Sequence, residues 1–422
     1  MANSAGVAVA RRRMAGAGVS VAVFLACLEL GLRVAPQAIP LDLLEQFEPA
    51  MRSAIASRRK LTTKKDTVLV PRHDGGPADR MWVYRPGAEV HWTFDEPGIT
   101  NTVRVDDAGF CNPVADAHRK PAFDVVTLGD SFTFCTTVDP VDTWSNRFAE
   151  LSGLDTFNLG QPGRGPHEYV ALFEHFGASK SPRFVVMNIY EGNDFRDAYF
   201  FHEAAMQAAA SRTSGDTVPC PFDTAAACNA FLALKHGAPG RRSYAYNLLS
   251  AIVWRLREAV ARSEIDFQYV VRFADGSQVG MNSRNGDRDE VEFARQLTEG
   301  RLSTALFDDA LERFVALGDR RGFVPVVLYT PSAYTAYEGM ATFDDATIEA
   351  TMRGYSQTLR AYFAARADEL GYTFHDLTTD LQGAASRSSA DDLLYFRTNV
   401  HLTAAGHRVV AGRLADLIAD LR

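Results

Sequence analysis

The sequence predicts an α/β fold, a three-layer α/β/α sandwich whose central parallel sheet has about five strands, with a small N-terminal β-element and a helical and loop insertion. Five short apolar runs recur along the chain. In most of the segments between them, apolar residues recur at helical spacing, which is typical of parallel strands joined by crossover helices. The first three runs also end in Gly, Asn or Ser, residues expected at the ligand-binding edge of such a sheet. The runs are Val125 to Leu128, Thr156 to Leu159, Phe184 to Ile189, Val324 to Tyr329 and Thr373 to His375.

The composition is that of an ordinary globular chain. Its 422 residues are 46% hydrophobic and 23% charged, which is enough to bury a sizeable core. The net charge of -8 argues against a nucleic-acid partner. The chain contains no P-loop, H-E-x-x-H or C-x-x-C motif, and His202-Glu203 lacks the second histidine of a zinc site. We therefore expect neither a cofactor nor a metal ion.

The first residues have the pattern of a membrane signal. Arg11 to Arg13 precede an apolar segment, Met14 to Leu28. Counted through Leu32, with Glu29 near the far interface, the span is just long enough to cross a bilayer. Because arginines stay on the cytoplasmic side, we interpret residues 1–36 as a cytoplasmic tip and an uncleaved single-pass transmembrane signal-anchor. A cleaved signal peptide ending near Ala35 to Ala38 and a lipoprotein signal at Cys27 are the alternatives. All three export the rest of the chain, so we expect it on the periplasmic side of the inner (cytoplasmic) membrane.

Residues 37–120 are predicted to hold a stalk helix and the small β-element. Apolar residues from Leu43 to Met51 recur at helical spacing. The basic residues that follow, from Arg58 to Lys65, are interpreted as a solvated face. From Met81 to Phe94 large apolar residues alternate with polar ones, which favours short strands packed beside the main sheet.

The remaining residues, 121–422, are predicted to form the main domain, interrupted by an insertion at about 200–302. The insertion departs from the alternation of strands and helices. It carries a helix around Tyr244 to Val260 and a polar stretch from Asp275 to Asp289. Because it follows the third strand, we expect it to overhang the pocket at that edge of the sheet.

Export gives the cysteines a structural meaning. Outside the membrane segment the chain has four, Cys111, Cys135, Cys220 and Cys228, in a compartment that permits disulfides. Four cysteines allow three pairings. We favour Cys111 with Cys135, and Cys220 with Cys228 because their short loop would close easily. Free buried thiols are the alternative.

The stretch from Asp124 to Cys135 contains the candidate nucleophile. Gly129-Asp130-Ser131 directly follows the first apolar run. A sharp turn at this point would expose the hydroxyl of Ser131 and leave its backbone N–H free, as a nucleophilic serine requires. The alternative is that Asp130 and Ser131 only cap a following helix.

Three later blocks complete an ordered set with this stretch: Gly163, Gly192-Asn193-Asp194 and His401. With these four blocks the sequence, from about Met81 to the end, resembles the SGNH (GDSL-like) hydrolase family. The resemblance implies that Ser131 attacks an ester and that His401 takes its proton. It also implies an oxyanion hole made by the backbone N–H groups of Ser131 and Gly163 and the side-chain amide of Asn193. Asp130 and Asp194 are then expected to support the turns that carry these groups.

One departure from the family pattern concerns the histidine. The family usually places an aspartate two or three residues before it, but Asn399 and Thr398 occupy those positions. In serine proteases, replacing the equivalent carboxylate by an amide costs about 10,000-fold. Three alternatives follow. Asn399 or a backbone carbonyl orients His401, Asp391 or Asp392 supplies the charge, or activity is much reduced.

The resemblance and the export signal together predict an exported, membrane-tethered serine esterase that forms an acyl-serine intermediate. Acylated carbohydrates of the envelope or exported polysaccharide, and small esters, are the expected substrates. An O-acetyltransferase acting on polysaccharide through the same Ser131 and His401 is one alternative. A catalytically impaired envelope-binding protein is another. The sequence predicts no particular protein partner.

Overall fold

The computed structural model describes residues 19–44, 47, 51, 55, 61–63, 67–71, 80–93, 100–214, 243–261, 267–283 and 288–422. Tertiary contacts divide the chain into two units. Unit 1 comprises Met1–Asp66 and Cys220–Glu264, and unit 2 comprises Thr67–Pro219 and Ile265–Arg422. The insertion expected at about 200–302 is thus divided between the two units.

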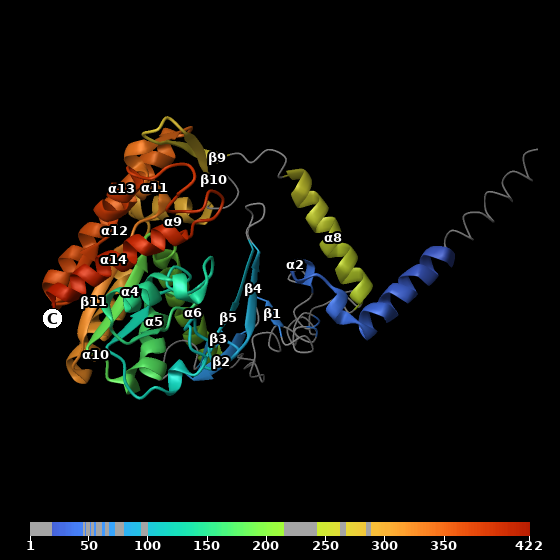
Figure 1. The fold of residues 1–422 in the computed structure, drawn as a ribbon, viewed down its shortest axis with the longest axis horizontal. Helices are drawn as coiled ribbons and strands as arrows, with labels where there is room; N and C mark the ends of the chain where they lie inside the picture. The colour runs from blue at the N-terminus through green and yellow to red at the C-terminus, as the bar shows by residue number, and fades with distance from the viewer. Residues whose placement is uncertain are drawn as a thin grey trace, which may run out of the picture. The chain divides into compact units, whose positions relative to one another are not determined.

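A five-stranded parallel sheet forms the centre of unit 2, which confirms the predicted fold class (Figure 1). Its strand order is β13-β11-β8-β6-β7. Phe184 of the central strand pairs with Val125 on one side and Val324 on the other, so three strands begin at one level. The strands are β6 (Val125–Leu128), β7 (Thr156–Asn158), β8 (Phe184–Tyr190), β11 (Val324–Thr330) and β13 (Thr373–Asp376).

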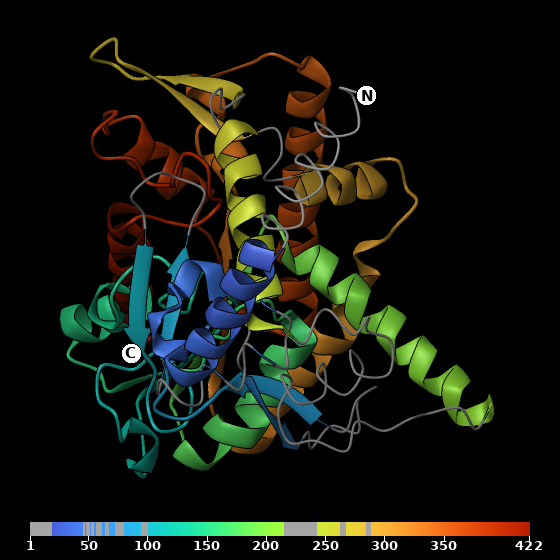
Figure 2. The same cartoon turned by 90° about the vertical axis from the view of Figure 1, so that its right-hand side faces the viewer.

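Helices cover both faces of this sheet (Figure 1 and Figure 2). Every residue of β6 and β8 is buried, as expected for strands covered on both faces. Right-handed crossovers place α4 on the opposite face from α5, and α4 packs against α14 while α5 packs against α10. The long helices are α4 (Trp144–Ser152), α5 (Pro166–Leu172), α6 (Asp194–Ser214), α10 (Asp308–Arg321), α12 (Ala346–Leu370), α13 (Thr378–Ala385) and α14 (Ala404–Asp420).

Short helices connect these elements, and glycines end α10 and α12 directly before strands. Gly322 follows α10 and Gly371 follows α12, with φ angles of 78° and 80° that favour glycine, and a strand begins two residues later in each case. The short helices are η2 (Ala117–Arg119), η3 (Pro140–Asp142), η4 (Phe173–Gly177), η5 (Ala178–Lys180), η7 (Thr304–Phe307), α11 (Ala333–Ala336) and η8 (Glu338–Met340).

Short antiparallel strands precede the sheet, as the alternation of aromatic residues predicts. β2 (Thr67–Pro71) pairs with β3 (Arg80–Tyr84), and β4 (Glu89–Thr93) pairs with β5 (Thr100–Arg104). The ring of Tyr84 lies 5.2 Å from that of Phe134, just after the candidate nucleophile, so this element packs beside the loop that follows β6. Phe94, the last residue of the predicted alternation, lies outside the described residues.

The polar stretch from Asp275 to Asp289 is not a simple loop, which corrects our interpretation. β9 (Phe267–Arg272) and β10 (Gln278–Ser283) form an antiparallel hairpin, β12 (Ala341–Phe343) joins it, and α9 (Arg288–Thr298) follows. The polar residues supply the turn, where Asp275 accepts a hydrogen bond from the Ser277 N–H (2.8 Å). Val279 and Met281 alternate inward and are buried. Only two apolar side chains therefore mark β10.

The described residues of unit 1 are mainly helical. Residues 19–34 form a helix, followed by η1 (Pro36–Ala38), α2 (Leu41–Leu44) and β1 (Leu61–Thr63), and the insertion contributes α8 (Tyr244–Ala261), close to the predicted helix. A core that includes Leu32, Leu44 and Ala251 joins the N-terminal residues to α8. Among the residues that the structure describes, no helix combines the length and apolarity needed to cross a membrane. Residues 14–18 of the expected span are outside that range.

Candidate active site

The turn after β6 presents Ser131 as predicted. A Cβ on Gly129 would lie 2.1 Å from Thr133 Oγ1, so a glycine is needed where the strand ends. The Asp130 carbonyl accepts hydrogen bonds from the N–H groups of Thr133 (3.2 Å) and Phe134 (3.0 Å), which reverses the chain immediately. Residues 131–138 are turns and bends, so Ser131 does not cap a helix. Ser131 itself is half-buried.

Asp130 joins the nucleophile to the third sequence block. Its carboxylate is fully buried and accepts hydrogen bonds from the Phe132 N–H (2.8 Å), the Asn193 side-chain amide (3.0 Å) and the Ser131 hydroxyl (3.4 Å). Burial raises the pKa of Asp130, and these hydrogen bonds oppose that rise. Asp130 thus fixes the orientation of both Ser131 and Asn193, the supporting role expected for it.

Three hydrogen-bond donors near Ser131 are available to an oxyanion. Within the described residues, neither the Ser131 N–H nor the Gly163 N–H donates to another group. The Asn193 amide donates one of its two hydrogens to Asp130 and keeps the second. At Gly163, where φ is 67°, no atom lies within 4 Å of the position a Cβ would take. The donors predicted from the resemblance are therefore present and unsatisfied.

The loop that carries Gly163 is fastened directly to the nucleophile turn. The Gln161 N–H donates to the carbonyl of Gly129 (2.9 Å). The buried side chain of Asn158 donates to the carbonyl of Thr133 (2.8 Å). These hydrogen bonds join the ends of β6 and β7, so the first two sequence blocks share one edge of the sheet.

Asp194 closes the turn after β8. It is fully buried and accepts hydrogen bonds from the Tyr190 N–H (2.8 Å) and the Tyr169 hydroxyl (2.5 Å). Burial and the charge of Asp130 raise its pKa well above the ordinary value. On the next turn of the helix, burial raises the pKa of Asp197 to about 6. Asp194 therefore anchors the segment that presents Asn193.

His401 is brought to the same place by a ring stack. Its imidazole stacks on Phe132, the residue after the nucleophile, with ring centroids 5.1 Å apart. The Asn399 side-chain oxygen accepts hydrogen bonds from His401 Nδ1 and from the His401 backbone N–H (3.0 Å). An amide oxygen only accepts, so Nδ1 carries the proton and Nε2 is the basic nitrogen. The loop is held further by Thr137, whose hydroxyl donates to the Leu402 carbonyl (3.0 Å).

The two alternative acids lie elsewhere on the same loop. Asp391 and Asp392 are exposed, and Asp392 forms an ion pair with Arg408 at 3.7 Å. Together they line a cavity of about 310 Å³ with Tyr395 and Arg397. The group observed on Nδ1 of His401 is the Asn399 amide.

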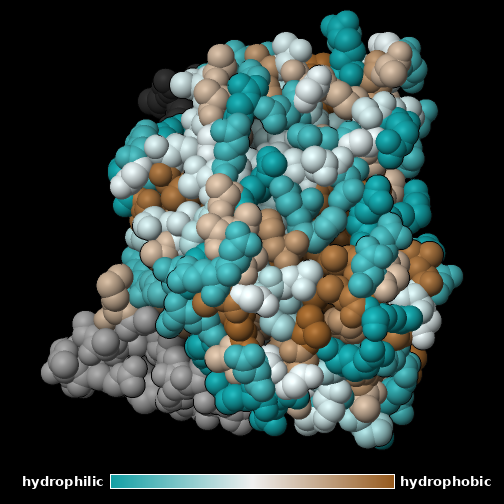
Figure 3. Space-filling view, turned by 90° about the vertical axis from the view of Figure 1, so that its left-hand side faces the viewer, coloured by the Kyte–Doolittle hydropathy of each residue, from teal (hydrophilic) through white to brown (hydrophobic). Residues whose placement is uncertain are grey.

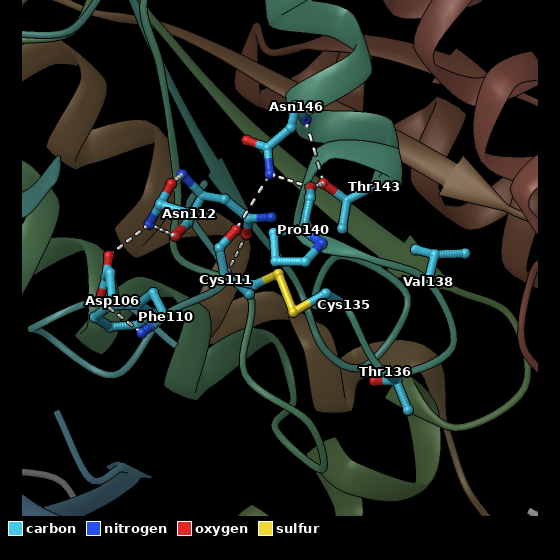
Figure 4. Close-up of a disulfide and its surroundings, with 12 residues drawn as sticks. Asp106, Phe110, Cys111, Asn112, Cys135, Thr136, Val138, Pro140, Thr143 and Asn146 are labelled. Atoms are coloured by element: carbon cyan, nitrogen blue, oxygen red, sulfur yellow. Dashed lines mark hydrogen bonds between the residues drawn. A yellow bond between two sulfur atoms is a disulfide. The ribbon is translucent and has the colours of Figure 1, made fainter. Parts of the chain in front are cut away.

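A disulfide fixes the loop that follows the nucleophile (Figure 4). Cys111 and Cys135 are bonded as predicted, with Cα atoms 5.8 Å apart. The Asn146 amide donates to the carbonyl of Cys111 (3.2 Å), and the Asn101 amide donates to that of Cys135 (3.0 Å). Cys220 and Cys228 lie outside the described residues, and Cys27 is a free, exposed thiol.

Two buried acids were missed by the sequence analysis, and the first is Glu191. Its carboxylate is fully buried and accepts hydrogen bonds from the hydroxyls of Tyr329 (2.8 Å), Ser332 (2.7 Å) and Thr335 (2.6 Å). Burial raises its pKa. These contacts join the ends of β8 and β11 directly before Gly192. An acidic residue at the end of an apolar strand is the signal that could have identified it.

The second missed acid is Glu290 on α9. The Tyr190 hydroxyl donates to Glu290 Oε1 (3.0 Å), and a Cβ on Gly192 would lie 2.1 Å from the same oxygen. Nearby, the Asn282 N–H of β10 donates to the Arg397 carbonyl in the histidine loop (2.8 Å). The part of the insertion that belongs to unit 2 therefore contacts both the Asn193 block and the loop that carries His401.

Metal-binding side chains do not gather in the described part of the chain, where no group of three or more His, Cys, Asp or Glu could hold an ion.

Among the comparisons with known proteins, those with solved structures give matches and the other two do not. No family model matches the chain, and no curated protein matches it. The chain is similar to GDSL-type hydrolases of known structure. They include a putative lipolytic G-D-S-L protein from Desulfitobacterium hafniense (12% identity, TM-score 0.31, covering 69% of this chain and 98% of that one) and an acetylxylan esterase from Geobacillus stearothermophilus (13%, 0.32, 71% and 95%). A GDSL-like lipase from Bacteroides thetaiotaomicron is a third (12%, 0.30, 75% and 94%). At these identities and TM-scores, activity has to be argued from this chain's own residues.

Proposed function

We propose that this chain is a serine ester hydrolase that works through an acyl-Ser131 intermediate. The observation that supports the proposal is that the N–H groups of Ser131 and Gly163 and the second hydrogen of the Asn193 amide bond to no other described group, after strands of one parallel sheet. Donors held in place before reaction are what a tetrahedral intermediate needs. A histidine stacked beside the same turn supplies the base.

Acylation begins when Ser131 Oγ attacks the ester carbonyl carbon. Its proton passes to Nε2 of His401, which becomes imidazolium. The carbonyl oxygen takes the negative charge and accepts hydrogen bonds from Ser131, Gly163 and Asn193. As the intermediate collapses, the bond to the leaving alkoxide breaks and His401 returns the proton to that oxygen. The products of this half-reaction are the alcohol and the acyl-serine ester.

Deacylation repeats these steps with water. His401 removes a proton from the water, the hydroxide oxygen bonds to the acyl carbon, and the same three donors bind the oxyanion. The bond to Ser131 Oγ then breaks, and Oγ recovers the proton from His401. Free carboxylic acid leaves, and the enzyme is regenerated.

Asn399 takes the place of the usual carboxylate in this scheme. Its amide oxygen fixes the tautomer and the direction of the His401 ring but contributes no negative charge. The imidazolium formed during acylation is therefore less stabilised than beside an aspartate, and we expect a slower but functional triad. This assigns the orienting role to Asn399 rather than to Asp391 or Asp392.

The proposal includes export and a tether at the membrane. The Arg11 to Arg13 run before an apolar segment supports both. The Cys111–Cys135 disulfide supports export, because such bonds persist in oxidising compartments. O-acyl groups on envelope or exported polysaccharide are the substrates that this location would offer. Transfer of the acyl group to a sugar hydroxyl instead of water is the alternative second half-reaction.

Covalent labelling tests the nucleophile without knowledge of the substrate. A fluorophosphonate probe should label wild-type Ser131, and labelling should be lost in Ser131→Ala and strongly reduced in His401→Ala. Ser386→Ala is the matched control, because Ser386 is exposed on unit 2 and should leave labelling unchanged. Equal labelling of wild type and Ser131→Ala would overturn the proposal and leave an envelope-binding protein with this fold.

Turnover of a short p-nitrophenyl ester completes the test. Wild type should release p-nitrophenol with a burst, and Ser131→Ala should not. Adding an oligosaccharide acceptor separates the two second half-reactions. Acetate release that is unaffected by the acceptor supports hydrolysis, whereas acetylated oligosaccharide formed at the expense of acetate shows a transferase.

A further inference from the structure

Charge is divided unevenly between the two units. Unit 1 has 16 Lys and Arg against 8 Asp and Glu, a net charge of +8. The remaining residues, which form unit 2, have 28 against 44, a net charge of -16. The overall charge of -8 therefore hides a basic unit attached to a strongly acidic one. A basic unit in an acidic chain indicates a partner with a negative surface.

Unit 1 also exposes large apolar side chains on the helix formed by residues 19–34. Phe24 is 61% exposed, although the same helix buries Leu32 in the core of the unit. Water-exposed phenylalanine, leucine and valine on one helix are unusual in a folded domain unless something covers them. The exposed set is Val19, Val21, Val23, Phe24, Leu25, Leu30 and Val34.

The second helix of the unit, α8, has the same property. Its inner side, which includes Ala245 and Ala251, is buried, and its outer side is apolar and exposed. The first charged residue after the start of the helix is Arg255, so eleven residues pass without a charge. Trp254 is 43% exposed and Leu256 is 61% exposed. The exposed apolar set is Tyr246, Leu249, Ile252, Val253, Trp254 and Leu256.

Specific contacts hold the two helices together. Glu29 accepts hydrogen bonds from the Ser243 hydroxyl (2.7 Å) and the Ala245 N–H (2.9 Å), so its carboxylate satisfies the N-terminus of α8. Arg33 pairs with Glu29 (2.7 Å) and lies over the ring of Tyr244, 5.4 Å from its centroid. The charged groups of this junction are thus paired within unit 1, and the outer apolar side chains are left exposed.

We propose that α8 contacts an anionic phospholipid bilayer next to the helix of residues 19–34, which belongs to the segment proposed above as the membrane tether, and the proposal rests on that tether. The insertion in the hydrolase domain would then contact lipid through Trp254 and Leu256, in addition to any anchor at the N-terminus. Apolar residues with a tryptophan on a basic unit are what interfacial helices use, because the rings enter the acyl boundary while Lys and Arg pair with lipid phosphates. This surface goes beyond the proposed ester hydrolysis and does not depend on it.

The net charge of unit 1 favours an anionic bilayer over a second copy of the chain as the partner that covers this apolar surface. Docking of unit 1 onto unit 1 of a second copy would bring a +8 unit against another +8 unit, which opposes that contact. Figure 3 shows one face of unit 2, where apolar patches lie among hydrophilic residues. An anionic bilayer matches both the apolar area and the positive charge.

Quenching of Trp254 fluorescence by brominated lipid tests the proposal in the full chain. The protein is mixed with vesicles of phosphatidylcholine, or of phosphatidylcholine with about 30 mol % phosphatidylglycerol, with brominated or ordinary acyl chains. On anionic vesicles we expect brominated lipid to remove about a quarter of the emission, because Trp254 is one of four tryptophans. Trp254→Phe should abolish this loss, and neutral vesicles should give less of it.

Leu256→Gln and Leu151→Gln form a matched pair of variants. Both leucines are equally exposed, at 61% and 62%, but Leu151 lies on unit 2. Leu256→Gln should weaken the quenching severalfold, and Leu151→Gln should leave it at the wild-type level. Near-UV circular dichroism and ester hydrolysis, read in the same samples, report folding of unit 2 independently.

Several outcomes would overturn the proposal. Absence of Trp254 quenching on anionic vesicles would show that α8 does not contact lipid. Equal quenching on neutral and anionic vesicles removes the role assigned to charge. Trp254 emission that changes with protein concentration but not with added lipid would show that a second copy covers the surface. None of these results bears on Ser131.

Discussion

Asn399 is the residue that most distinguishes this site from a Ser-His-Asp triad. Its amide oxygen contacts Nδ1 of His401, where a carboxylate would also stabilise the imidazolium. We predict that Asn399→Asp accelerates ester hydrolysis, by roughly 10- to 100-fold at alkaline pH, given the 10,000-fold cost of the reverse change in a protease. The new carboxylate favours the protonated imidazole, so the acid limb of the pH profile should move to higher pH. The pH dependence of kcat/KM for a p-nitrophenyl ester measures both effects.

Asp392→Asn is the control for that experiment. Asp392 is exposed and paired with Arg408, so its charge should have little influence on His401, and the rate should stay near the wild-type value. If Asp392→Asn slowed hydrolysis strongly while Asn399→Asp changed nothing, Asp392 would be the functional acid. Asn399→Ala should be slower than wild type, because it frees the ring to turn.

Asn193 allows a second prediction at this scale. Its amide is oriented by Asp130 and offers one hydrogen to the oxyanion. Removing one such donor lowers kcat by about 100- to 1000-fold, and we expect Asn193→Ala to do so with little change in KM. Steady-state kinetics with the same ester provide the measurement. A kcat within about threefold of wild type would remove Asn193 from the oxyanion hole.

Individual site residues differed in how far the sequence could predict them. Ser131 was identified because it closely follows an apolar run, whereas the roles of Gly163 and Asn193 came only from the family resemblance. Parallel strands bring all three positions to one edge. The partner of His401 could only be narrowed to alternatives, because it depends on the path of an irregular loop. Glu191 was missed for a different reason. A buried acid is recognisable only from the hydroxyls that surround it, and these come from β11 and the segment after it.

At the level of elements, the disulfide loop carries the next prediction. Cys111–Cys135 closes a loop with a sequence separation of 24 that includes Ser131 and Phe132 and ends just before Thr137. Loop-closure entropy of that length corresponds to roughly 3 kcal/mol, so replacing both cysteines by serine should lower the free energy of unfolding by about this amount. Urea denaturation followed by near-UV circular dichroism measures the change. Activity should fall as well, because the loop that holds Phe132 and Thr137 loosens.

Cys27→Ser is the matched control for the disulfide. Cys27 is exposed and free, so its replacement should change neither stability nor the response to reductant. Dithiothreitol should lower the stability of wild type toward that of the double serine variant and leave the variant unchanged. A wild type insensitive to reductant would show that the bond contributes little.

The sequence predicted the parallel sheet better than the antiparallel hairpin. β6, β8 and all but the first two residues of β11 are buried and therefore appear as mostly apolar runs with β-branched residues. β10 buries one face and contains two buried apolar residues among Gln, Gly, Asn and Ser, so its pattern resembles a polar loop. Its identity depends on pairing with β9, which sequence periodicity does not report.

At the scale of the whole molecule, the C-terminal helix α14 packs against α4, which comes much earlier in the chain. His407 on α14 is buried, and its Nδ1 accepts a hydrogen bond from the Trp144 N–H at the start of α4 (3.1 Å), 263 residues earlier in the chain. The Trp144 indole in turn donates to the carbonyl of Phe132 (3.0 Å), beside the nucleophile. The contact that places the histidine loop next to Ser131 therefore requires a neutral, accepting imidazole at His407.

Acid should weaken this contact, and the sign follows from the pKa of His407. Burial, assisted by His401, lowers that pKa from 6.5 to about 3. Above pH 6.5 the group is neutral in both the folded and the unfolded chain, so its full contribution is present. As pH falls, the unfolded chain binds the proton first, and stability is lost between pH 6.5 and about 3. Between pH 7 and pH 5 the loss from this group is about 2 kcal/mol.

His407→Asn keeps an acceptor but cannot titrate, so it should be less stable at neutral pH and lose about 2 kcal/mol less than wild type on acidification. Urea denaturation at the two pH values measures the difference. The buried acids Asp194 and Asp197 are present in both proteins and cancel, so parallel losses would show that His407 is not held neutral.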